Sequence, residues 1–323
     1  DLQWEKAILS RIPVILDEAQ NFPEIFPRLR SAIDADRKRF GRFLILGSVS
    51  PGLMKSVSDF LTGRIALTEL SPLSIGELQP DSQDDLWLMG GFPDGGPLNP
   101  GSFPQWQKNY LELLAGRDLP AWGLPASPMV IRRLFRMLAA AHGTVWNASM
   151  LGKSLGLSFH TVNSYLDYLE QAYLVRRVQP FYSNIKKRLI KSPKVYWRDS
   201  GLLHSLLNVS AMDDLLVQPW VGLSWEGWVI EQICIALKNQ GVDFEPHFFR
   251  TSDGYELDLL LEYRAKLWAV EMKLSSSPDR KDLDRLNKAA DMAGADKRIL
   301  LSRSREHIEA KDVVMTNVTG FLS

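Results

Sequence analysis

The segment Val14-Ile15-Leu16-Asp17-Glu18 decides the fold of the first part of this chain. The apolar run from Pro13 to Leu16 predicts a buried strand that leads directly into two carboxylates. A second apolar run, Phe43 to Leu46, predicts another strand and is followed by Gly47-Ser48. Three apolar residues recur between the strands at the spacing of an amphipathic helix: Ile25, Leu29 and Ile33. Two buried strands joined by a helix indicate a parallel α/β sheet, which is covered on both faces.

The two carboxylates after the first strand predict nucleotide chemistry. In a P-loop ATPase, one acid at this place supports Mg²⁺ and its neighbour positions the attacking water. Asp17 is therefore the predicted cofactor and metal ligand, Glu18 is the predicted catalytic acid, and Ser48 is expected to sense the γ-phosphate. The phosphate-binding loop Gly-x-x-x-x-Gly-Lys-Ser/Thr that should precede such a strand occurs nowhere in the 323 residues. We thus expect ATP and Mg²⁺ here only if such a loop lies upstream; otherwise the acids simply cap a helix.

Composition sets broad limits on function. The 38 basic and 38 acidic residues cancel, so DNA binding would need a local basic patch. Cys234 is the only cysteine, which leaves no intrachain disulfide and no cysteine-based zinc site. No apolar run approaches the roughly 20 residues that span a bilayer, and the N-terminus lacks the features of a signal peptide. We therefore expect a cytoplasmic protein without a membrane partner; homo-oligomer formation remains open.

A helix-turn-helix is predicted in the middle of the chain. Residues 147–155 and 158–172 read as two helices with Gly156 at the turn, and the second helix has an apolar stripe of Val162, Leu166 and Leu169. The following run from Tyr173 and the basic stretch 184–194 would form a wing. The candidate nucleic-acid contacts are His160 and Asn163 in a groove, and Lys186, Lys187 and Arg188 on phosphate. Because Asp167 and Glu170 would repel phosphate, a rigid spacer or a protein-interaction module is the alternative.

The last third of the chain predicts a nuclease-like core. A helix around Trp225 precedes three strand-like runs, 244–250, 255–262 and 267–273, with a further helix at 282–293 and a strand at 297–301. Period two places Glu256, Asp258 and Leu260 on one face of the middle strand, and it places Glu271 and Lys273 together on the next. If these strands form a hairpin, Asp258 and Glu271 converge.

An acid followed by Glu-x-Lys on the next strand is the PD-(D/E)xK arrangement. Two carboxylates hold Mg²⁺ or Mn²⁺, and a lysine activates water or stabilises the charged phosphorane. Asp258, Glu271 and Lys273 are therefore the predicted catalytic residues. Glu226 joins Asp258 and Glu271 as a predicted metal ligand. The alternative is an edge hairpin with solvated charges, which explains Glu256 and Glu262 well.

The order of several short motifs resembles a known family. After Asp17-Glu18-Ala19-Gln20 come the strand ending in Gly47-Ser48 and four further segments: Leu61-Thr62-Gly63-Arg64, Leu70 to Ser74, Gly90-Gly91-Phe92-Pro93 and Arg117-Asp118. This order resembles that of bacterial and archaeal AAA-like ATPases that carry a C-terminal domain of unknown function with a nuclease-like core. The likeness covers nearly the whole chain, but the family's phosphate-binding loop has no match here. It implies that Arg64 lies near the nucleotide, where an arginine can reach a γ-phosphate; a surface salt bridge is the simpler alternative.

These observations predict an α/β protein with four parts. They are a partial P-loop ATPase domain (1–80), a helical connector (81–127), a winged helix (128–195) and a PD-(D/E)xK-like mixed sheet with flanking helices (196–323). The first functional hypothesis is an AAA-like ATPase coupled to a nucleic-acid-associated nuclease-like domain. The alternatives are a Mg²⁺-dependent DNA nuclease with a degenerate ATPase part, and a non-catalytic protein that binds DNA or a partner.

Overall fold

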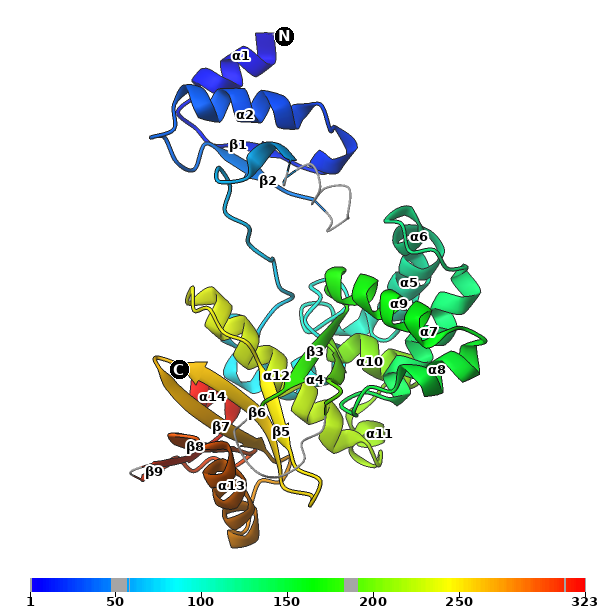
Figure 1. Ribbon diagram of the computed structural model, residues 1–323, viewed down its shortest axis with the longest axis vertical. Helices are drawn as coiled ribbons and strands as arrows, with labels where there is room; N and C mark the ends of the chain where they lie inside the picture. Colours follow the sequence, from blue (N-terminus) through cyan, green and yellow to red (C-terminus); the bar gives the residue numbers. More distant parts are fainter. Residues whose placement is uncertain (1, 48–56, 58, 183–190, 311, 323) are drawn as a thin grey trace. The chain divides into compact units, whose positions relative to one another are not determined.

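The computed structural model describes residues 2–47, 57, 59–182, 191–310 and 312–322. The chain divides into two compact units (Figure 1). The first unit comprises residues 1–70 and 118–125, and the second comprises residues 71–117 and 126–323. Both units combine helices with strands, so the mixed α/β class predicted from the sequence is confirmed.

The first unit is built on two short parallel strands, as predicted. Strand β1 (Val14–Leu16) pairs in parallel with β2 (Phe43–Ile45), and α2 (Ile25–Ala35) connects them. Helix α1 (Leu2–Leu9) precedes this sheet, and the short α6 (Leu119–Ala121) lies in the separate segment of the unit. The small core consists of residues from α2 and neighbouring segments: Ala19, Phe26, Leu29, Val57 and Leu61. The apolar face of α2 thus covers one face of the sheet.

The outer side chains of this sheet are exposed in the described part of the chain. Ile15 is 62% exposed and Leu44 is 50% exposed. The sequence from Ile65 to Leu73 also has the apolar residues of a strand, but residues 65–74 form none. Leu70 is 96% exposed there, so its apolar side chain has no core to enter. Burial against a neighbouring element, rather than β propensity alone, is what makes such a run a strand.

The second unit begins with short helices. Helices α4 (Gln83–Met89) and α5 (Gln105–Leu113) fall in the predicted connector, and α7 (Pro128–Ala140) follows. The Gly90-Gly91 pair after α4 packs tightly, because a Cβ on Gly90 would lie 2.2 Å from a carboxylate oxygen of Asp199. Side chains larger than hydrogen are therefore excluded at this turn.

The predicted helix-turn-helix is present as a pair of helices. Helix α8 (Ala148–Leu155) and helix α9 (Phe159–Gln171) are separated by Gly156, which has the left-handed conformation that ends α8. Asn147 and Ser158 cap the two helices with their side chains. Strands β3 (Val175–Pro180) and β4 (Lys194–Trp197) follow as an antiparallel pair.

One mixed sheet of eight strands joins this helical region to the rest of the second unit. The described strand order is β4-β3-β5-β6-β7-β8-β10-β9. Strand β3 pairs in parallel with β5 (His247–Arg250) through Gln179–His247 and Pro180–Phe248. Strands β6 (Glu256–Tyr263) and β7 (Lys266–Met272) form the predicted hairpin, and β7 pairs in parallel with β8 (Lys297–Leu301). Strands β9 (Ile308–Ala310) and β10 (Val313–Thr316) complete the edge.

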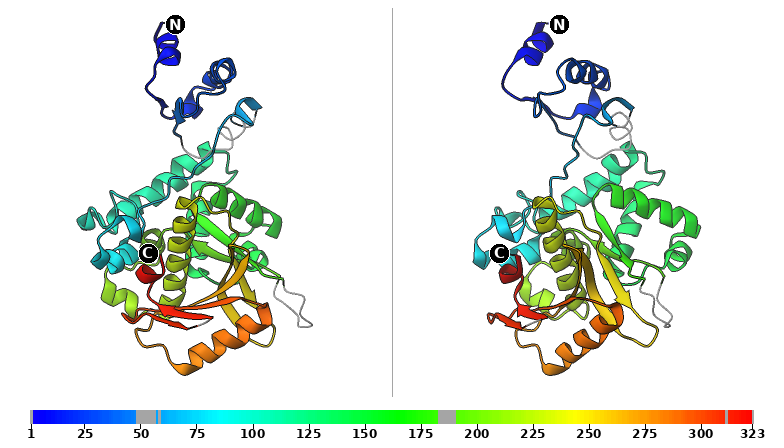
Figure 2. Two further views of the ribbon diagram at one scale, coloured as in Figure 1. Left: turned by 90° about the vertical axis from the view of Figure 1, so that its left-hand side faces the viewer. Right: turned by 60° about the vertical axis from the view of Figure 1, so that its left-hand side comes forward.

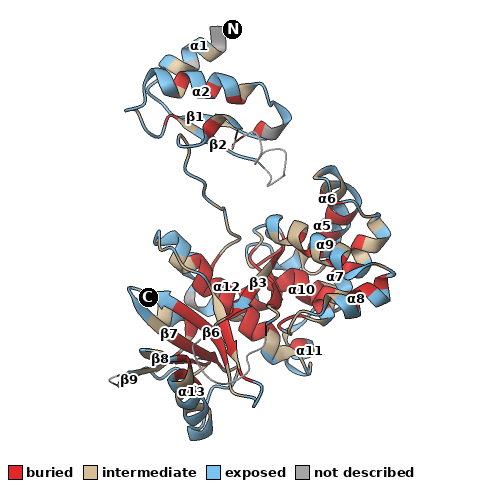
Figure 3. Ribbon diagram, in the orientation of Figure 1, coloured by how far each residue is buried: buried red, intermediate tan, exposed pale blue. Residues whose placement is uncertain are grey.

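Helices cover both faces of the central strands (Figure 2). On one face α12 (Val221–Asn239) packs with α4 and α14 (Val318–Leu322). On the other face α13 (Arg280–Ala293) packs its buried Leu286, Ala289 and Ala290 against the sheet. Two further helices, α10 (Ser200–Leu206) and α11 (Met212–Leu216), belong to this unit. Burial is concentrated in α12, α10 and strands β6 and β7 (Figure 3), and the candidate site lies at this buried centre.

Candidate functional site

The predicted acids of the last third lie together at one end of the β6–β7 hairpin. Asp258 is one position beyond the Leu259–Val270 pair, so it lies beside Glu271. Its Oδ2 atom accepts a hydrogen bond of 2.8 Å from the backbone N–H of Met272. Asp258 and Glu271 are both buried. The hairpin therefore brings together the two carboxylates that the sequence predicted to converge.

A bulge in β6 determines where Asp258 points. Phe249 pairs with Leu257, but His247 pairs with Leu260, so β6 has one more residue than β5 in this interval. Leu257 and Leu260 consequently pack into the same apolar cluster. The period-two placement of Glu256, Asp258 and Leu260 on one face is therefore wrong for Leu260, whereas Glu256 and Asp258 both lie near Lys194. Bulges turn side chains out of their regular alternation and are common beside functional sites.

The side chain of Lys273 contacts that of Glu271, and the Glu-x-Lys pattern predicted that they would lie on the same face of the strand. Its Nζ atom donates a hydrogen bond of 2.8 Å to Oε1 of Glu271 and lies 3.8 Å from Oδ1 of Asp282 on α13. The Lys273 side chain is 29% exposed, so it is the most accessible member of this group. A molecule that approaches from solvent therefore meets the ammonium before the buried carboxylates.

Glu226 on α12 has partners that the sequence did not predict. Its Oε1 atom accepts hydrogen bonds from Nζ of Lys194, at 2.9 Å, and from the hydroxyl of Tyr196. Nζ of Lys194 also lies 2.7 Å from Oε1 of Glu256. We call Lys194, Glu226, Glu256, Asp258, Glu271 and Lys273 the acidic cluster. The sequence does contain a signal for these partners. Lys194 and Tyr196 are two residues apart on an otherwise apolar strand, so their side chains lie on the same face of it.

Burial and mutual repulsion govern the charges of the acidic cluster. Burial raises the pKa of Asp258 well above its usual value, Glu271 and Glu226 raise it further, and Lys194 opposes this effect. Burial also raises the pKa of Glu271, while the ammonium of Lys273 lowers it. Two buried carboxylates that repel each other are stabilised by a cation between them.

The carboxylates of this cluster suit an ion such as Mg²⁺, which keeps several water ligands, better than a metal whose ligands all come from the protein. Within the described ranges, no group of three or more His, Cys, Asp or Glu side chains is arranged to hold a metal. Mg²⁺ commonly takes only one or two carboxylates and completes its shell with water and substrate phosphate. Asp258 and Glu271 fit that requirement. Glu226, the third predicted ligand, is instead bound to Lys194 and Tyr196.

The predicted nucleotide residues of the first unit lie at its surface. Asp17 and Glu18 are both exposed. Glu18 has a left-handed backbone (φ 50°), and its N–H donates a 3.0 Å hydrogen bond to Oδ1 of Asp17. The predicted sensor Ser48 lies outside the described residues. The structure thus places the acid pair at the end of β1, as predicted, and the nucleotide roles of these residues stay predictions.

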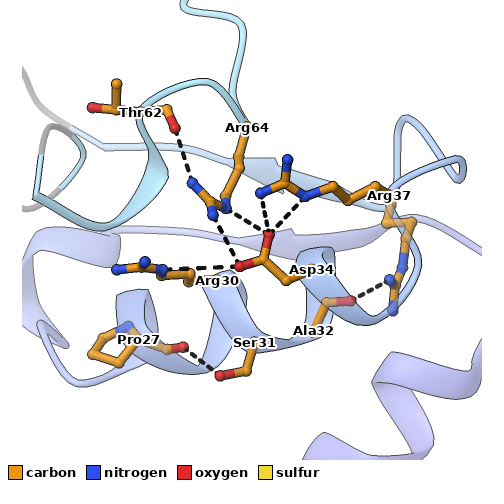
Figure 4. Close-up of polar contacts among 9 residues, drawn as sticks. Pro27, Arg30, Ser31, Ala32, Asp34, Arg37, Thr62 and Arg64 are labelled. Carbon is orange, nitrogen blue, oxygen red and sulfur yellow. Dashed lines mark hydrogen bonds and ion pairs between the residues drawn. The ribbon is translucent and has the colours of Figure 1, made fainter.

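Arg64 is held by Asp34 of α2 (Figure 4). Its Nε and Nη2 atoms donate hydrogen bonds of 2.8 and 2.9 Å to the two oxygens of Asp34, and Nη1 donates to the carbonyl of Thr62. Hydrogen bonds from Arg64 and Arg37 lower the pKa of Asp34 to about 2. The surface ion pair that was the alternative for Arg64 is therefore present, and the catalytic role of Arg64 stays a prediction.

The predicted nucleic-acid contacts are only partly in the described chain. His160 is exposed on α9 and its ring lies 3.8 Å from that of Phe159. Asn163 accepts a 2.7 Å hydrogen bond from Nε1 of Trp146. The two acids of α9, Asp167 and Glu170, both contact the guanidinium of Arg177. Lys186, Lys187 and Arg188 lie outside the described residues.

A serine and a histidine form a hydrogen-bonded pair in the core of the second unit. Nε2 of His204 lies 2.7 Å from Oγ of Ser224. The same oxygen accepts a 3.1 Å hydrogen bond from Nε1 of Trp87, and Nδ1 of His204 bonds the carbonyl of Leu88. Both side chains are fully enclosed, and burial lowers the pKa of His204 to about 4. This chain of hydrogen bonds satisfies buried polar atoms between α4, α10 and α12.

Comparison with known proteins gives three family matches along the chain. Residues 2–79 match an AAA domain, residues 80–213 match the domain of unknown function DUF8612, and residues 221–321 match the domain of unknown function DUF4143. These matches support an AAA-like ATPase with domains of unknown function, as the resemblance implied. They do not identify a winged helix or a nuclease core, so those two interpretations stay predictions.

Two curated proteins are similar to most of this chain. They are uncharacterized proteins of Mycobacterium tuberculosis (Rv2008c) and Mycobacterium bovis (Mb2031c), each 37% identical over 266 residues. The alignment covers 82% of this chain but only 59% of each relative's length. No solved structure matches the chain. Among the described residues, no helix combines the length and apolarity needed to cross a membrane.

Proposed function

We propose that this protein is an AAA-like ATPase whose second unit contains a nuclease-like, metal-dependent site for nucleic acid. The observation that carries the proposal is the convergence of the buried Asp258 and Glu271 with the partly exposed Lys273 at one end of the β6–β7 hairpin. The AAA match at residues 2–79 supports the ATPase part. A cytoplasmic location and homo-oligomer formation belong to the same proposal.

Each residue of the convergence has a distinct chemical task. Asp258 and Glu271 supply the negative charge that holds Mg²⁺ or Mn²⁺, and the Met272 N–H fixes the orientation of Asp258. Such an ion, when bound, neutralises phosphate charge and acidifies a water molecule. Lys273 already donates to Glu271, and its partly exposed ammonium can also donate to a phosphate oxygen. This division of tasks fits hydrolysis of a phosphodiester.

Cleavage assays test this site directly. Wild-type protein is incubated with Mn²⁺ and single-stranded, duplex or branched DNA, beside Asp258→Asn and Lys273→Met variants. We expect wild-type cleavage and a loss of at least about 100-fold in each variant, because Asp258→Asn removes charge that holds the metal ion and Lys273→Met removes the ammonium that would contact the phosphate. Glu262→Gln is the matched control, since Glu262 is an exposed acid on the same strand. Absence of wild-type cleavage on all three substrates would contradict nuclease activity.

For the first unit we propose a nucleotide site in which Asp17 supports Mg²⁺ and Glu18 positions the attacking water. Ser48 would sense the γ-phosphate. Phosphate-loop amides carry much of triphosphate recognition, so residues 1–323 should bind ATP weakly or not at all. Micromolar ATP binding by this chain in calorimetry would contradict that expectation. In a protein that also has an upstream phosphate-binding loop, Glu18→Gln should retain ATP binding and stop hydrolysis.

A second candidate function is non-catalytic DNA binding through the α8–α9 region. The observation that favours it is the contact of Arg177 with both Asp167 and Glu170, because it reduces the repulsion between α9 and phosphate. The proposed contacts are His160, Asn163, Lys186, Lys187 and Arg188. In EDTA, a triple alanine variant of the three basic residues should weaken DNA binding and lower its salt dependence, while Asp258→Ala should leave the affinity intact or raise it.

A further inference from the structure

Lys194 is an unusually well-enclosed cation beside the proposed metal site. The residue is 3% exposed, and its Nζ atom lies 2.9 Å from Glu226 and 2.7 Å from Glu256. The ammonium also lies 5.5 Å from the centre of the Phe248 ring. A buried lysine is costly unless its charge is compensated, and here two carboxylates from α12 and β6 compensate it. The position of Lys194 is therefore fixed from three sides.

The charge balance of the acidic cluster leaves room for a single divalent ion. Four carboxylates belong to the cluster, from Glu226, Glu256, Asp258 and Glu271, and two lysines oppose them. With all groups ionised, a net charge of minus two remains. At the rim, Arg250 lies 3.5 Å from Glu256 and Asp282 lies 3.8 Å from Lys273; their opposite charges leave this balance unchanged. One Mg²⁺ or Mn²⁺ would neutralise the cluster, and a second would overcharge it.

Glu226 differs from Asp258 and Glu271 in the side chains that donate hydrogen bonds to it. Its Oε1 atom already accepts from Lys194 and Tyr196. Among the described residues, Asp258 accepts from one backbone N–H and Glu271 from one lysine. We propose that Lys194 is a built-in cation of this site, which engages Glu226 so that one divalent ion binds, at Asp258 and Glu271, in place of two. The statement about the ion rests on the proposed function, whereas the pairing of Lys194 with Glu226 does not.

The first test measures Mn²⁺ binding to the full chain by calorimetry and electron paramagnetic resonance. We expect wild-type protein to bind one Mn²⁺. The double variant Lys194→Met/Glu226→Gln keeps the net charge of the acidic cluster, so its Mn²⁺ affinity should lie within about threefold of wild type, because Glu226 is not a ligand. A loss of about tenfold or more in this double variant would make Glu226 a ligand and overturn the proposal.

The second test removes the built-in cation. In Lys194→Met, Glu226 is left uncompensated, so the metal-free midpoint of thermal unfolding should fall by about 10 °C. Mn²⁺ should then raise that midpoint, and Mn²⁺ affinity should exceed the wild-type value by about tenfold or more. Lys297→Met is the matched control, because Lys297 is an ion-paired lysine on another strand of the sheet; it should show neither effect. A Lys194→Met variant with no gain in Mn²⁺ affinity or stabilisation would overturn the proposal.

The two tests separate this inference from the proposed function. If wild-type protein binds no Mn²⁺, the nuclease-like function fails, and the response of Lys194→Met to Mn²⁺ still decides the role of Lys194. If wild-type protein binds Mn²⁺ but Lys194→Met gains nothing, the function stands and this inference fails. If Lys194→Met does not fold, the double variant Lys194→Met/Glu226→Gln is tested in its place. It removes one charge of each sign, so no uncompensated carboxylate remains at residue 226. Its recovery of folding would uphold the pairing, and its failure to recover would overturn it.

Discussion

At the scale of single residues, Asp199 makes stability depend on pH. It caps α10 by accepting a 2.9 Å hydrogen bond from Leu202, and it accepts one of 2.8 Å from the N–H of Gly91. Burial raises the pKa of Asp199 to about 6 from 3.8, although these hydrogen bonds favour the charged form. Between these two values the folded state binds the proton more tightly than the unfolded state. The free energy of unfolding should therefore fall as pH rises from about 4 to 6.

The measurement is urea unfolding at several pH values between 4 and 7. The shift corresponds to a decline of about 3 kcal/mol as an upper limit, because one pKa unit is about 1.4 kcal/mol. Asp199→Asn should remove this part of the decline, although it also weakens the cap. Asp213→Asn, which changes an exposed acid in the first turn of α11, is the control. Identical pH profiles for wild type and Asp199→Asn would show that Asp199 does not cause the decline.

Arg64 and Asp34 allow a catalytic role to be separated from a structural one. The pair lies at the surface, where such pairs contribute little to stability, so Arg64→Ala and Asp34→Ala should each leave the free energy of unfolding almost unchanged. In a protein that also has a phosphate-binding loop, Arg64→Ala should reduce ATP turnover by about 1000-fold. Asp34→Ala should reduce it far less. Equal turnover in the two variants would assign Arg64 to the ion pair alone.

At the scale of elements, a buried ion pair attaches the β3–β4 strands to α12. Glu231 of α12 accepts two hydrogen bonds from Arg176 of β3, at 2.8 and 3.0 Å, and one of 2.7 Å from Arg198 after β4. Burial opposes ionisation of Glu231, but the two arginines prevail and lower its pKa to about 2. A lowered folded pKa stabilises the protein above pH 4.5, and this contribution is lost as the pH falls toward 2.

Removing that charge should loosen the junction between these elements. Glu231→Gln removes the buried carboxylate that two largely enclosed arginines share, so the free energy of unfolding should fall by about 3–5 kcal/mol at pH 7. Glu170→Gln is the control, because Glu170 pairs with the neighbouring Arg177 of the same strand at a more exposed place; its cost should stay below about 1 kcal/mol. Chemical unfolding at pH 7 measures both. Similar losses in the two variants would show that burial of Glu231 adds nothing.

The elements also show which features a sequence can predict. Val162, Leu166 and Leu169 are buried on α9, as their helical spacing predicted. The β6–β7 hairpin and the closeness of Asp258 and Glu271 likewise follow from local alternation. The bulge at Asp258 does not, because it depends on the register with β5. The sequence predicted Lys194 to belong to a basic wing, but the residue is buried. Its burial depends on contact with Glu226, which is 32 residues away in the chain. Local patterns therefore predict elements, whereas long-range pairing determines the details of the site.

At the scale of the whole molecule, the eight-stranded sheet unites regions that the sequence divides. The boundary predicted between residues 195 and 196 falls inside the region of β3, β4 and β5, and β3 pairs with both of the others. The apolar cluster on the α12 face includes Val178 of β3, Tyr196 of β4 and Phe248 of β5. Hydrogen bonds and a shared core thus cross that boundary. We expect the α8–α9 region and the β5–β8 region to unfold together.

Limited proteolysis followed by thermal unfolding tests this expectation. Residues 65–74 form no helix or strand, and Leu70 is 96% exposed, so a protease that cuts after leucine should cleave there first. The larger product should persist and show one cooperative transition, because a shared sheet and core couple its parts. Glu231→Gln should lower the midpoint of that single transition without splitting it. Two separate transitions in the larger product would show instead that the α8–α9 region and the β5–β8 region are independent domains despite the strand pairing between them.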